Sequence, residues 1–291
     1  METALIVEDD RDQGEVAAQL LRLRGLRPQV APTGTEGLEW AQKHRPDVIL
    51  LDLMLPDTNG FEVCRHLRAR PDTVMIPIVM VTALGGDEHR LRGFWVGANA
   101  YVTKPYGARD LYEAVDKALS WKNDLQHEQV QGEIFLELNS SGTFLKEVNT
   151  FLEGQYALTP MTESQVEHMR QAVLEMGQNA IEWGNRDQVE ALVRVRYRVF
   201  GDRIEVVIRD EGPGFDPKSL SHAANPEDPL LHMDVREQLG LREGGFGLLI
   251  SRGMVDEMRH NGPGNEVTLV KRFRPAAAEP LEGAEPRADP A

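Results

Sequence analysis

The sequence predicts an α/β protein of two domains, the first of which is built on a doubly wound parallel sheet. Strand-like and helix-like patterns alternate over residues 1–122. Within them, the apolar run Val48–Leu51 has no polar interruption, as expected of a strand that is covered on both faces. The length of 291 residues is the third observation, because it accommodates two domains, each with its own core.

The apolar patterns of the first domain support this fold class in chain order. They are a strand at Leu5–Val7, a helical spacing at Val16, Leu20 and Leu23, and strands at Val48–Leu51, Ile76–Val81 and Tyr101–Val102. Such alternation predicts a parallel sheet with helices on both faces. Ligands of these sheets bind outside the carboxyl ends of the strands, so polar residues at those ends mark a candidate site.

The strand ends carry side chains of matching chemistry, in order Glu8-Asp9-Asp10, Asp52, Thr82 and Lys104. Converging carboxylates repel one another unless a hard dication neutralises them, and Mg²⁺ prefers oxygen ligands. Together with a hydroxyl and an ammonium group, they fit phosphoryl transfer to Asp52, with Thr82 and Lys104 contacting the phosphoryl oxygens. Taken singly, Asp52 reads equally as a turn residue, Thr82 as a strand-end threonine and Lys104 as a surface lysine.

Residues 1–122 resemble the receiver domain of two-component response regulators through the segments LIVEDD, LLDLMLPDTNG, VMVTA and YVTKP. The resemblance implies a five-stranded flavodoxin-like fold, with Asp52 as the phosphoacceptor. It also implies an upstream histidine kinase or phosphotransfer protein. The other implied participants are Asp9 and Asp52 as Mg²⁺ ligands, Glu8 acting on the metal through water, Thr82, Lys104, and Tyr101 at an aromatic switch position.

Charge and hydropathy exclude several classes of function. Residues 1–122 carry 18 acidic and 15 basic side chains, so −12 of the formal net charge of −15 falls on the rest of the chain. No basic effector domain follows, which argues against direct nucleic-acid binding. Without a long apolar run or a signal-peptide pattern, the sequence predicts a cytoplasmic protein that does not contact membranes. The single cysteine, Cys64, cannot form an internal disulfide.

After an expected linker at 123–131, the second domain is expected to span residues 132–274. A capping box at Thr162–Gln165 predicts the start of a helix whose apolar stripe is by default core. Glu175 and Asn179 are four residues apart and therefore share one face of that helix. Alone, this pair is either a solvated helix edge or part of a site.

Glycine-rich segments follow at two places. Val193–Phe200 and Ile204–Arg209 alternate as the strands of a hairpin. The second strand ends in Asp210-Glu211-Gly212-Pro213-Gly214, where glycines let the backbone approach a ligand closely. A long loop at 216–242 precedes Gly244-Gly245-Phe246-Gly247, which opens an apolar helix as expected if its N-terminal amides receive phosphate.

This order of elements resembles the GHKL ATP-binding fold, an α/β sandwich of mixed sheet and helices, and looks closest to the anti-sigma-factor serine kinases. The resemblance implies ATP and Mg²⁺ as cofactors. The implied roles are general base or orientation of the attacking group for Glu175, Mg²⁺ ligand for Asn179, adenine recognition for Asp210, the nucleotide loop for Gly212 and Gly214, and phosphate binding for Gly245 and Gly247. Two departures are Trp183, where these kinases often carry His, and Asn265, where a Thr usually completes the pocket.

The resulting hypothesis is a phosphorelay protein in which Asp52 regulates an anti-sigma-type serine/threonine kinase. An anti-anti-sigma-like (STAS) protein or a sigma factor would be its partner, and the chain could form a homodimer. The alternative is a regulated ATP-binding module that sequesters a partner without phosphotransfer. A histidine kinase would require His127 as phosphoacceptor, whereas a solvated linker histidine is favoured. Residues 275–291, rich in Pro, Ala and Glu, are expected to be disordered.

Overall fold

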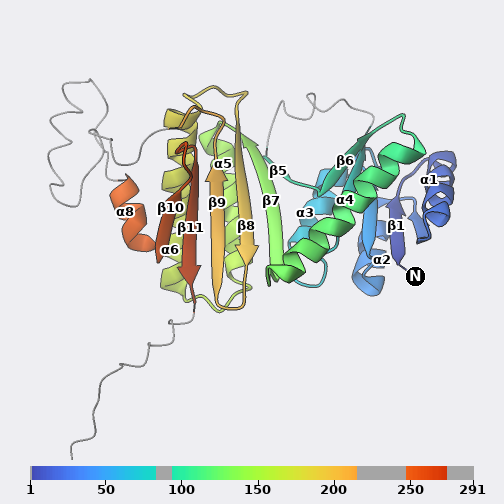
Figure 1. Cartoon of the computed structure of the whole chain (residues 1–291), viewed down its shortest axis with the longest axis horizontal. Helices are drawn as coiled ribbons and strands as arrows, with labels where there is room; N and C mark the ends of the chain where they lie inside the picture. The colour runs from blue at the N-terminus through green and yellow to red at the C-terminus, as the bar shows by residue number, and fades with distance from the viewer. Residues whose placement is uncertain (1, 83–93, 215–246, 274–291) are drawn as a thin grey trace, which may run out of the picture.

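The computed structural model describes residues 2–82, 94–214 and 247–273. Its elements in chain order are β1 (Thr3–Val7), α1 (Arg11–Leu23), β2 (Arg27–Ala31), α2 (Gly34–His44), β3 (Val48–Asp52), α3 (Gly60–Arg68), β4 (Ile78–Thr82), β5 (Phe94–Val96), β6 (Ala100–Thr103), α4 (Ala108–His127), β7 (Gly132–Asn139), α5 (Gly142–Tyr156), α6 (Glu163–Asn179), the π-helical turn η2 (Ala180–Gly184), β8 (Leu192–Val199), β9 (Arg203–Arg209), α8 (Gly247–Met254), β10 (Glu257–His260) and β11 (Glu266–Arg272). Two sheets result, side by side along the long axis of the molecule (Figure 1).

The first sheet is parallel and doubly wound, as predicted. Its five strands lie in the order β2-β1-β3-β4-β6. Alternate residues of β1 and β3 face opposite sides, because side chains along a strand point up and down in turn. Ile6 and Leu50 pack with α1 and α4, whereas Leu5 and Leu51 pack in the cluster that contains α2 and α3 residues. Helices therefore cover both faces, and the carboxyl ends of β1, β3 and β4 meet at one edge.

The second sheet is antiparallel throughout the strands described, in the order β10-β11-β9-β8-β7-β5. This differs from the mixed sheet that the resemblance implied. Helices α5 and α6 lie against one face of it (Figure 1). The predicted capping box begins α6, since the Thr162 hydroxyl accepts from Gln165 N at 3.3 Å and Gln165 Oε1 accepts from Thr162 N at 3.0 Å.

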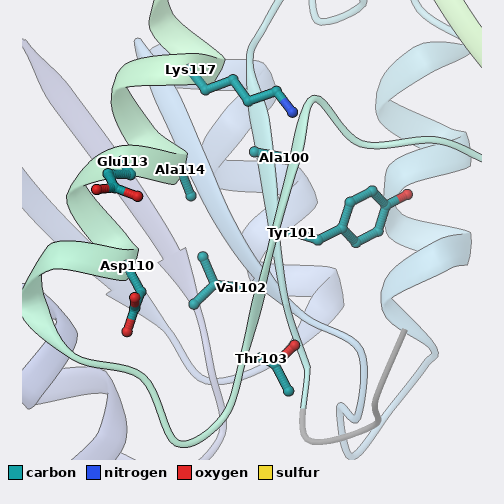
Figure 2. Close-up of a pocket in the computed structure, with 8 residues that line it drawn as sticks. All are labelled: Ala100, Tyr101, Val102, Thr103, Asp110, Glu113, Ala114 and Lys117. Atoms are coloured by element: carbon teal, nitrogen blue, oxygen red, sulfur yellow. The ribbon is translucent and has the colours of Figure 1, made fainter. Parts of the chain in front are cut away.

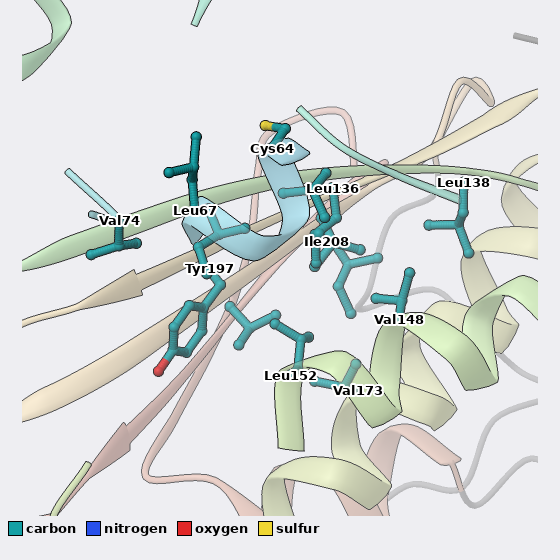
Figure 3. Packing of buried hydrophobic residues seen from close by; sticks show 14 of the residues in the cluster. Cys64, Leu67, Val74, Leu136, Leu138, Val148, Leu152, Val173, Tyr197 and Ile208 are labelled. Atoms are coloured by element: carbon teal, nitrogen blue, oxygen red, sulfur yellow. The ribbon is translucent and has the colours of Figure 1, made fainter. Parts of the chain in front are cut away.

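The two domains share a continuous apolar core. Cys64 and Leu67 of α3 fall in the same buried cluster as Leu136 of β7 and Val148 of α5 (Figure 3). A smaller cluster of Leu125, Val130 and Phe200 joins the end of α4 to the second sheet. Part of the segment expected as a linker is thus helical, because α4 continues to His127. Burial of this apolar surface holds the domains together.

Among the described residues, no helix is long and apolar enough to cross a membrane.

Candidate functional site

An acidic cluster lies at the carboxyl edge of the first sheet. Oxygen atoms of Glu8, Asp9 and Asp52 all lie within 4.8 Å of one another. Glu8 and Asp52 are each only 6% exposed, whereas Asp9 is exposed to solvent. Asp10, the fourth acidic strand-end residue, turns away to cap α1, since its Oδ1 accepts from Asp12 N and Gln13 N. Three of the four carboxylates therefore converge, and the fourth begins the next helix.

Lys104 places an ammonium group between the two buried carboxylates. Its Nζ donates to Glu8 Oε2 at 2.7 Å and also to Asp52 Oδ2. Burial disfavours the charged form of Lys104, but these hydrogen bonds outweigh burial and raise its pKa. Burial raises the pKa of the Glu8 carboxyl, and the negative charge of Asp52 adds to that effect, while Lys104 opposes it. Three carboxylates and one ammonium group leave two negative charges, which one divalent cation would neutralise.

Backbone contacts orient the remaining members of this first site. Asp52 Oδ1 accepts from Met54 N at 3.0 Å, so the loop after β3 fixes the carboxylate plane. Thr82 ends β4 and is 3% exposed. Its carbonyl accepts from Lys104 N at 2.6 Å, which ties the ends of β4 and β6 together. Asp52, Thr82 and Lys104 thus occupy neighbouring positions at one sheet edge.

Beside this edge, β6 and α4 border an open groove of about 420 Å³. Figure 2 shows Val102 and Ala114 between the strand and the helix, with Asp110, Glu113 and Lys117 along the helix. The Tyr101 ring points to the other side of β6 and is half exposed. Its hydroxyl oxygen accepts from Ala98 N at 3.3 Å. Tyr101 is therefore attached to the chain segment that follows β5.

A second candidate site forms where α6 meets α8. Glu175 is exposed and Asn179 is half-buried, and both come from the last turns of α6. A Cβ placed on Gly247 would lie 2.6 Å from Glu175 Oε2 and 3.8 Å from Asn179 Nδ2. The first residue of α8 thus adjoins both side chains, and a side chain there would displace the Glu175 carboxylate. The start of α8 also directs backbone N–H groups to this region, because the first turn of a helix leaves them without intrahelical partners.

Asp210 directly follows β9 and lies against Gly184, the last residue of η2. Its Oδ1 accepts from Gly212 N at 2.8 Å, and its own N–H donates to Asn265 O at 3.1 Å. The carboxyl is 9% exposed, and burial raises its pKa, opposed by the hydrogen bond from Gly212. A side chain on Gly184 would overlap Asp210, and one on Gly212 would overlap the Gly184 carbonyl. Close backbone approach therefore explains both glycines.

Gly214 and Asn265 continue the close contacts around Asp210. Gly214 has a φ of 79°, a left-handed conformation that glycine adopts without strain, and a Cβ there would overlap the Pro263 carbonyl. Asn265 Nδ2 donates to Gly212 O at 3.3 Å, and its Oδ1 accepts from Asn261 Nδ2 at 2.8 Å. The amide therefore links the glycine loop to the turn between β10 and β11.

Sequence reasoning missed a buried support beneath the loop. Asn185 Nδ2 donates to Ser140 Oγ at 2.8 Å, and Asn185 Oδ1 accepts from Glu211 N at 2.8 Å. Both Asn185 and Ser140 are 4% exposed. In sequence, Asn185 reads as one more polar residue of a loop, and its partners are 45 and 26 positions away. Only their burial identifies them as part of the site.

Several residues and segments singled out in the sequence do not belong to the two candidate sites as the structure describes them. Gly245 and the loop at 216–242 lie outside the described residues, as does the tail at 275–291. Trp183 is on η2 and is 43% exposed. His127 is the exposed last residue of α4, and β7 begins five residues later.

Comparisons with known proteins match two parts of the chain. Residues 4–116 match the model of the response regulator receiver domain, and residues 141–271 match that of the histidine kinase-like ATPase domain. The chain therefore carries a receiver domain followed by a histidine kinase-like ATPase domain.

Individual relatives match the first part. The sensory transduction protein RegX3 of Mycobacterium tuberculosis (strain H37Rv) is 38% identical over 132 residues, covering 45% of this chain and 57% of that protein. The DNA-binding dual master transcriptional regulator RpaA of Synechocystis sp. is 38% identical over 124 residues, covering 43% and 51%. The chain thus spans about half the length of these curated relatives. A solved response regulator receiver domain protein (CheY-like) from Methanospirillum hungatei JF-1 is 28% identical, covering 43% of this chain and 98% of that one, with a TM-score of 0.38.

Proposed function

We propose that phosphorylation of Asp52 regulates an ATP-dependent serine/threonine protein kinase formed by the second domain. The observation that carries the proposal is the pairing, in one chain, of a buried carboxylate held by Lys104 with a second site, in which Gly247 adjoins Glu175 and two glycines pack closely around Asp210. The first arrangement suits phosphoryl acceptance and the second suits nucleotide binding.

At the first site, the donor set fits Mg²⁺. Three carboxylates within 4.8 Å of one another offer hard oxygen ligands, and a single ammonium group leaves them under-neutralised. Asp9 and Asp52 would ligate the ion and Glu8 would contact it through water. When bound, Mg²⁺ supplies charge neutralisation for the phosphoryl oxygens.

Asp52 would accept the phosphoryl group from an upstream histidine kinase or phosphotransfer protein. A carboxylate oxygen forms the bond to phosphorus while the bond from phosphorus to the donor nitrogen breaks. Lys104 then exchanges part of its contact with Asp52 for a phosphoryl oxygen, and Thr82 donates its hydroxyl hydrogen to another. Met54 N holds the non-attacking carboxylate oxygen in place throughout.

At the second site, Asp210 would accept a hydrogen bond from the adenine amino group. Its carboxylate is preorganised for this task, because Gly212 N and the Asn265 carbonyl fix its position. Asn179 would hold the Mg²⁺ that accompanies ATP, and the amides at the start of α8 would receive phosphate together with Gly245. Asn265 would substitute for the usual threonine by supporting the loop through Gly212 O.

Glu175 would serve as the general base. The partner's Ser or Thr oxygen bonds to the γ-phosphorus, the bond to the β-phosphate oxygen breaks, and the hydroxyl proton passes to Glu175 while ADP leaves. The exposed position of Glu175 suits a protein substrate that approaches from solvent. An anti-anti-sigma-like (STAS) protein is the expected substrate.

The second candidate, partner sequestration without transfer, is favoured by Trp183, an exposed indole on η2 where the resembled kinases often carry His.

Labelled ATP and purified candidate partners test the proposal. We expect acid-stable label on Ser or Thr of the partner with the native chain, and loss of at least a hundred-fold in rate with Glu175→Gln. Glu163→Gln, an exposed residue at the other end of the same helix, is the matched control. ATP-dependent partner binding without transfer would establish the sequestering module instead, and acid-labile label on His127 would indicate a histidine kinase.

A further inference from the structure

Strand β5 belongs to a different sheet from the strands that precede and follow it in the sequence. It lies between β4 and β6, which pair with each other in the first sheet, yet β5 pairs antiparallel with β7 of the second sheet. The register joins Phe94 to Leu138 and Val96 to Leu136. Figure 1 shows β5 beside β7 at the junction of the two domains. The receiver domain thus adds a strand to an otherwise free edge of the ATPase sheet.

The contact is close where β5 ends. Gly97 N donates to Phe135 O at 2.6 Å, and a Cβ on Gly97 would lie 3.1 Å from Phe135 Cβ. Cys64 Sγ of α3 lies 3.7 Å from Gly97 O. A glycine therefore allows the receiver backbone to meet β7 on one side and α3 on the other.

Hydrogen bonds hold the residues that follow β5 against the rest of the receiver domain. Ala98 N donates to the Tyr101 hydroxyl, and Asn99 Oδ1 accepts both from Ile78 N at 2.7 Å and from Arg68 Nη2 at 2.8 Å. β5 lies in the connection that begins at Thr82, and Lys104 closes that connection through its hydrogen bond to Thr82 O. Residues 97–104, which run from the end of β5 to Lys104, therefore connect β5 to the Asp52 site along the chain.

A buried polar contact strengthens the same joint. Arg68, 1% exposed, lies with its guanidinium carbon 5.6 Å from the centre of the Trp121 ring. Trp121 Nε1 donates to Glu133 Oε2 at 2.6 Å, and Glu133 is ion-paired to Arg198. Residues of α3, α4, β7 and β8 are thus linked, which keeps β7 in register with the receiver.

The far end of β7 reaches the nucleotide site. Ser140, directly after β7, receives a hydrogen bond from Asn185, and Asn185 in turn receives one from Glu211 N, next to Asp210. β7 therefore has the receiver at one edge and the support of the Asp210 loop at its end. A displacement of this strand along or away from β5 would move both.

We propose that the pairing of β5 with β7 is the contact through which the Asp52 site controls nucleotide affinity at Asp210. The inference rests on the proposed function for the identity of the nucleotide, and it assigns the route of regulation. Strand pairing suits a switch, because registers are discrete and a shift by one residue reverses the direction of every side chain.

Three variants test the route. Gly97→Pro removes the N–H group that donates a hydrogen bond to Phe135 O. Tyr101→Phe removes only the hydroxyl oxygen that accepts a hydrogen bond from Ala98 N. Tyr112→Phe is the matched control, since that hydroxyl donates to Leu20 O inside the receiver. ATP affinity is measured by calorimetry on each full chain, with and without beryllofluoride and Mg²⁺, which together mimic a phosphoryl group on Asp52. Hydrogen exchange of amides 133–139 reports the edge of β7 directly.

We expect the mimic to shift ATP affinity by about five-fold or more in the native chain and in Tyr112→Phe. The shift should fall below two-fold in Tyr101→Phe and disappear in Gly97→Pro, where exchange at 133–139 should rise. A full shift in Gly97→Pro and Tyr101→Phe overturns the inference, as does a native chain that binds both ATP and the mimic without any shift. A native chain that does not bind ATP contradicts the proposed function instead, and the exchange measurement then decides whether β5 and β7 pair and respond to the mimic.

Discussion

Lys104 Nζ lies 2.7 Å from Glu8 Oε2 and also donates to Asp52, so one ammonium group joins carboxylates that are 44 residues apart in the chain. The Glu8 and Asp52 side chains are almost fully enclosed. Enclosed charges are tolerated when they are paired, and removal of one partner leaves the others uncompensated. The site is therefore poised to respond to a new anion, such as a phosphoryl group, at Asp52.

Asp52→Asn should abolish labelling by acetyl phosphate while the protein remains folded. The substitution nearly preserves volume and removes the nucleophilic charge, so the loss would be chemical. Phosphate incorporation is followed by gel electrophoresis, with circular dichroism to check folding. Asp116→Asn, an exposed carboxylate paired with Arg24, is the control and should retain full labelling. Label that persists on the Asp52 variant would show that another residue is the acceptor.

Asp9→Asn should weaken Mg²⁺ binding by about ten-fold or more, because it withdraws a charged oxygen from a three-carboxylate cluster. Asp9 is exposed, so its replacement leaves the core intact. Calorimetric titration with MgCl₂ measures the change. Asp12→Asn, on the first turn of α1, serves as control. Equal Mg²⁺ affinity in Asp9→Asn and the native chain would remove Asp9 from the ligand set.

Asp210→Asn should reduce ATP affinity by roughly ten- to a hundred-fold, the cost of losing a charged hydrogen-bond acceptor. Glu175→Ala should instead preserve affinity and eliminate turnover, since a general base acts only when the γ-phosphate moves. Calorimetry and a turnover assay on both variants separate binding from chemistry. Comparable losses of affinity in the two variants would show that this division of roles is wrong.

Nucleotide affinity should fall on acidification. Burial raises the pKa of Asp210 above its usual 3.8, so the carboxylate accepts a proton at a higher pH than a free aspartate. Acceptance from an adenine amino group requires the ionised form, so affinity is full above the raised pKa and is lost as the pH falls through it. Calorimetry at several pH values measures this loss. Asp210→Asn should show a flatter profile, and an equally steep profile in that variant would assign the titration to another group.

Trp121→Phe should lower the free energy of unfolding by about 1–3 kcal/mol, because the buried Glu133 carboxylate loses a hydrogen-bond donor. Urea denaturation followed by circular dichroism measures the change. Trp40→Phe is the control, since Trp40 is only partly buried and its ring stacks on His44 of the same helix, away from the contact between the domains. A loss no larger than that of the control would show that the contact between Trp121 and Glu133 contributes little to holding the domains together.

Local patterns in the sequence were sufficient to predict the first sheet, the α6 capping box and the β8–β9 hairpin. Each depends on residues a few positions apart: the apolar run Val48–Leu51, the pair Thr162 and Gln165, and the alternation around Gly201. The candidate residues at strand ends were also predictable, because parallel strands bring their carboxyl ends to one edge whatever the details of packing.

Other features depend on contacts between distant segments, which no local period encodes. The pairing of Val96 with Leu136 crosses a domain boundary, and Ser140 meets Asn185 across 45 residues. Asp10 resembles Asp9 in sequence, yet backbone geometry directs one to a helix cap and the other to the cluster. Sequence alone therefore determined which chemical groups this protein has at its strand and helix ends. The tertiary structure decided which of them are buried together and which strand joins the two domains, because burial and strand pairing are set by the whole fold.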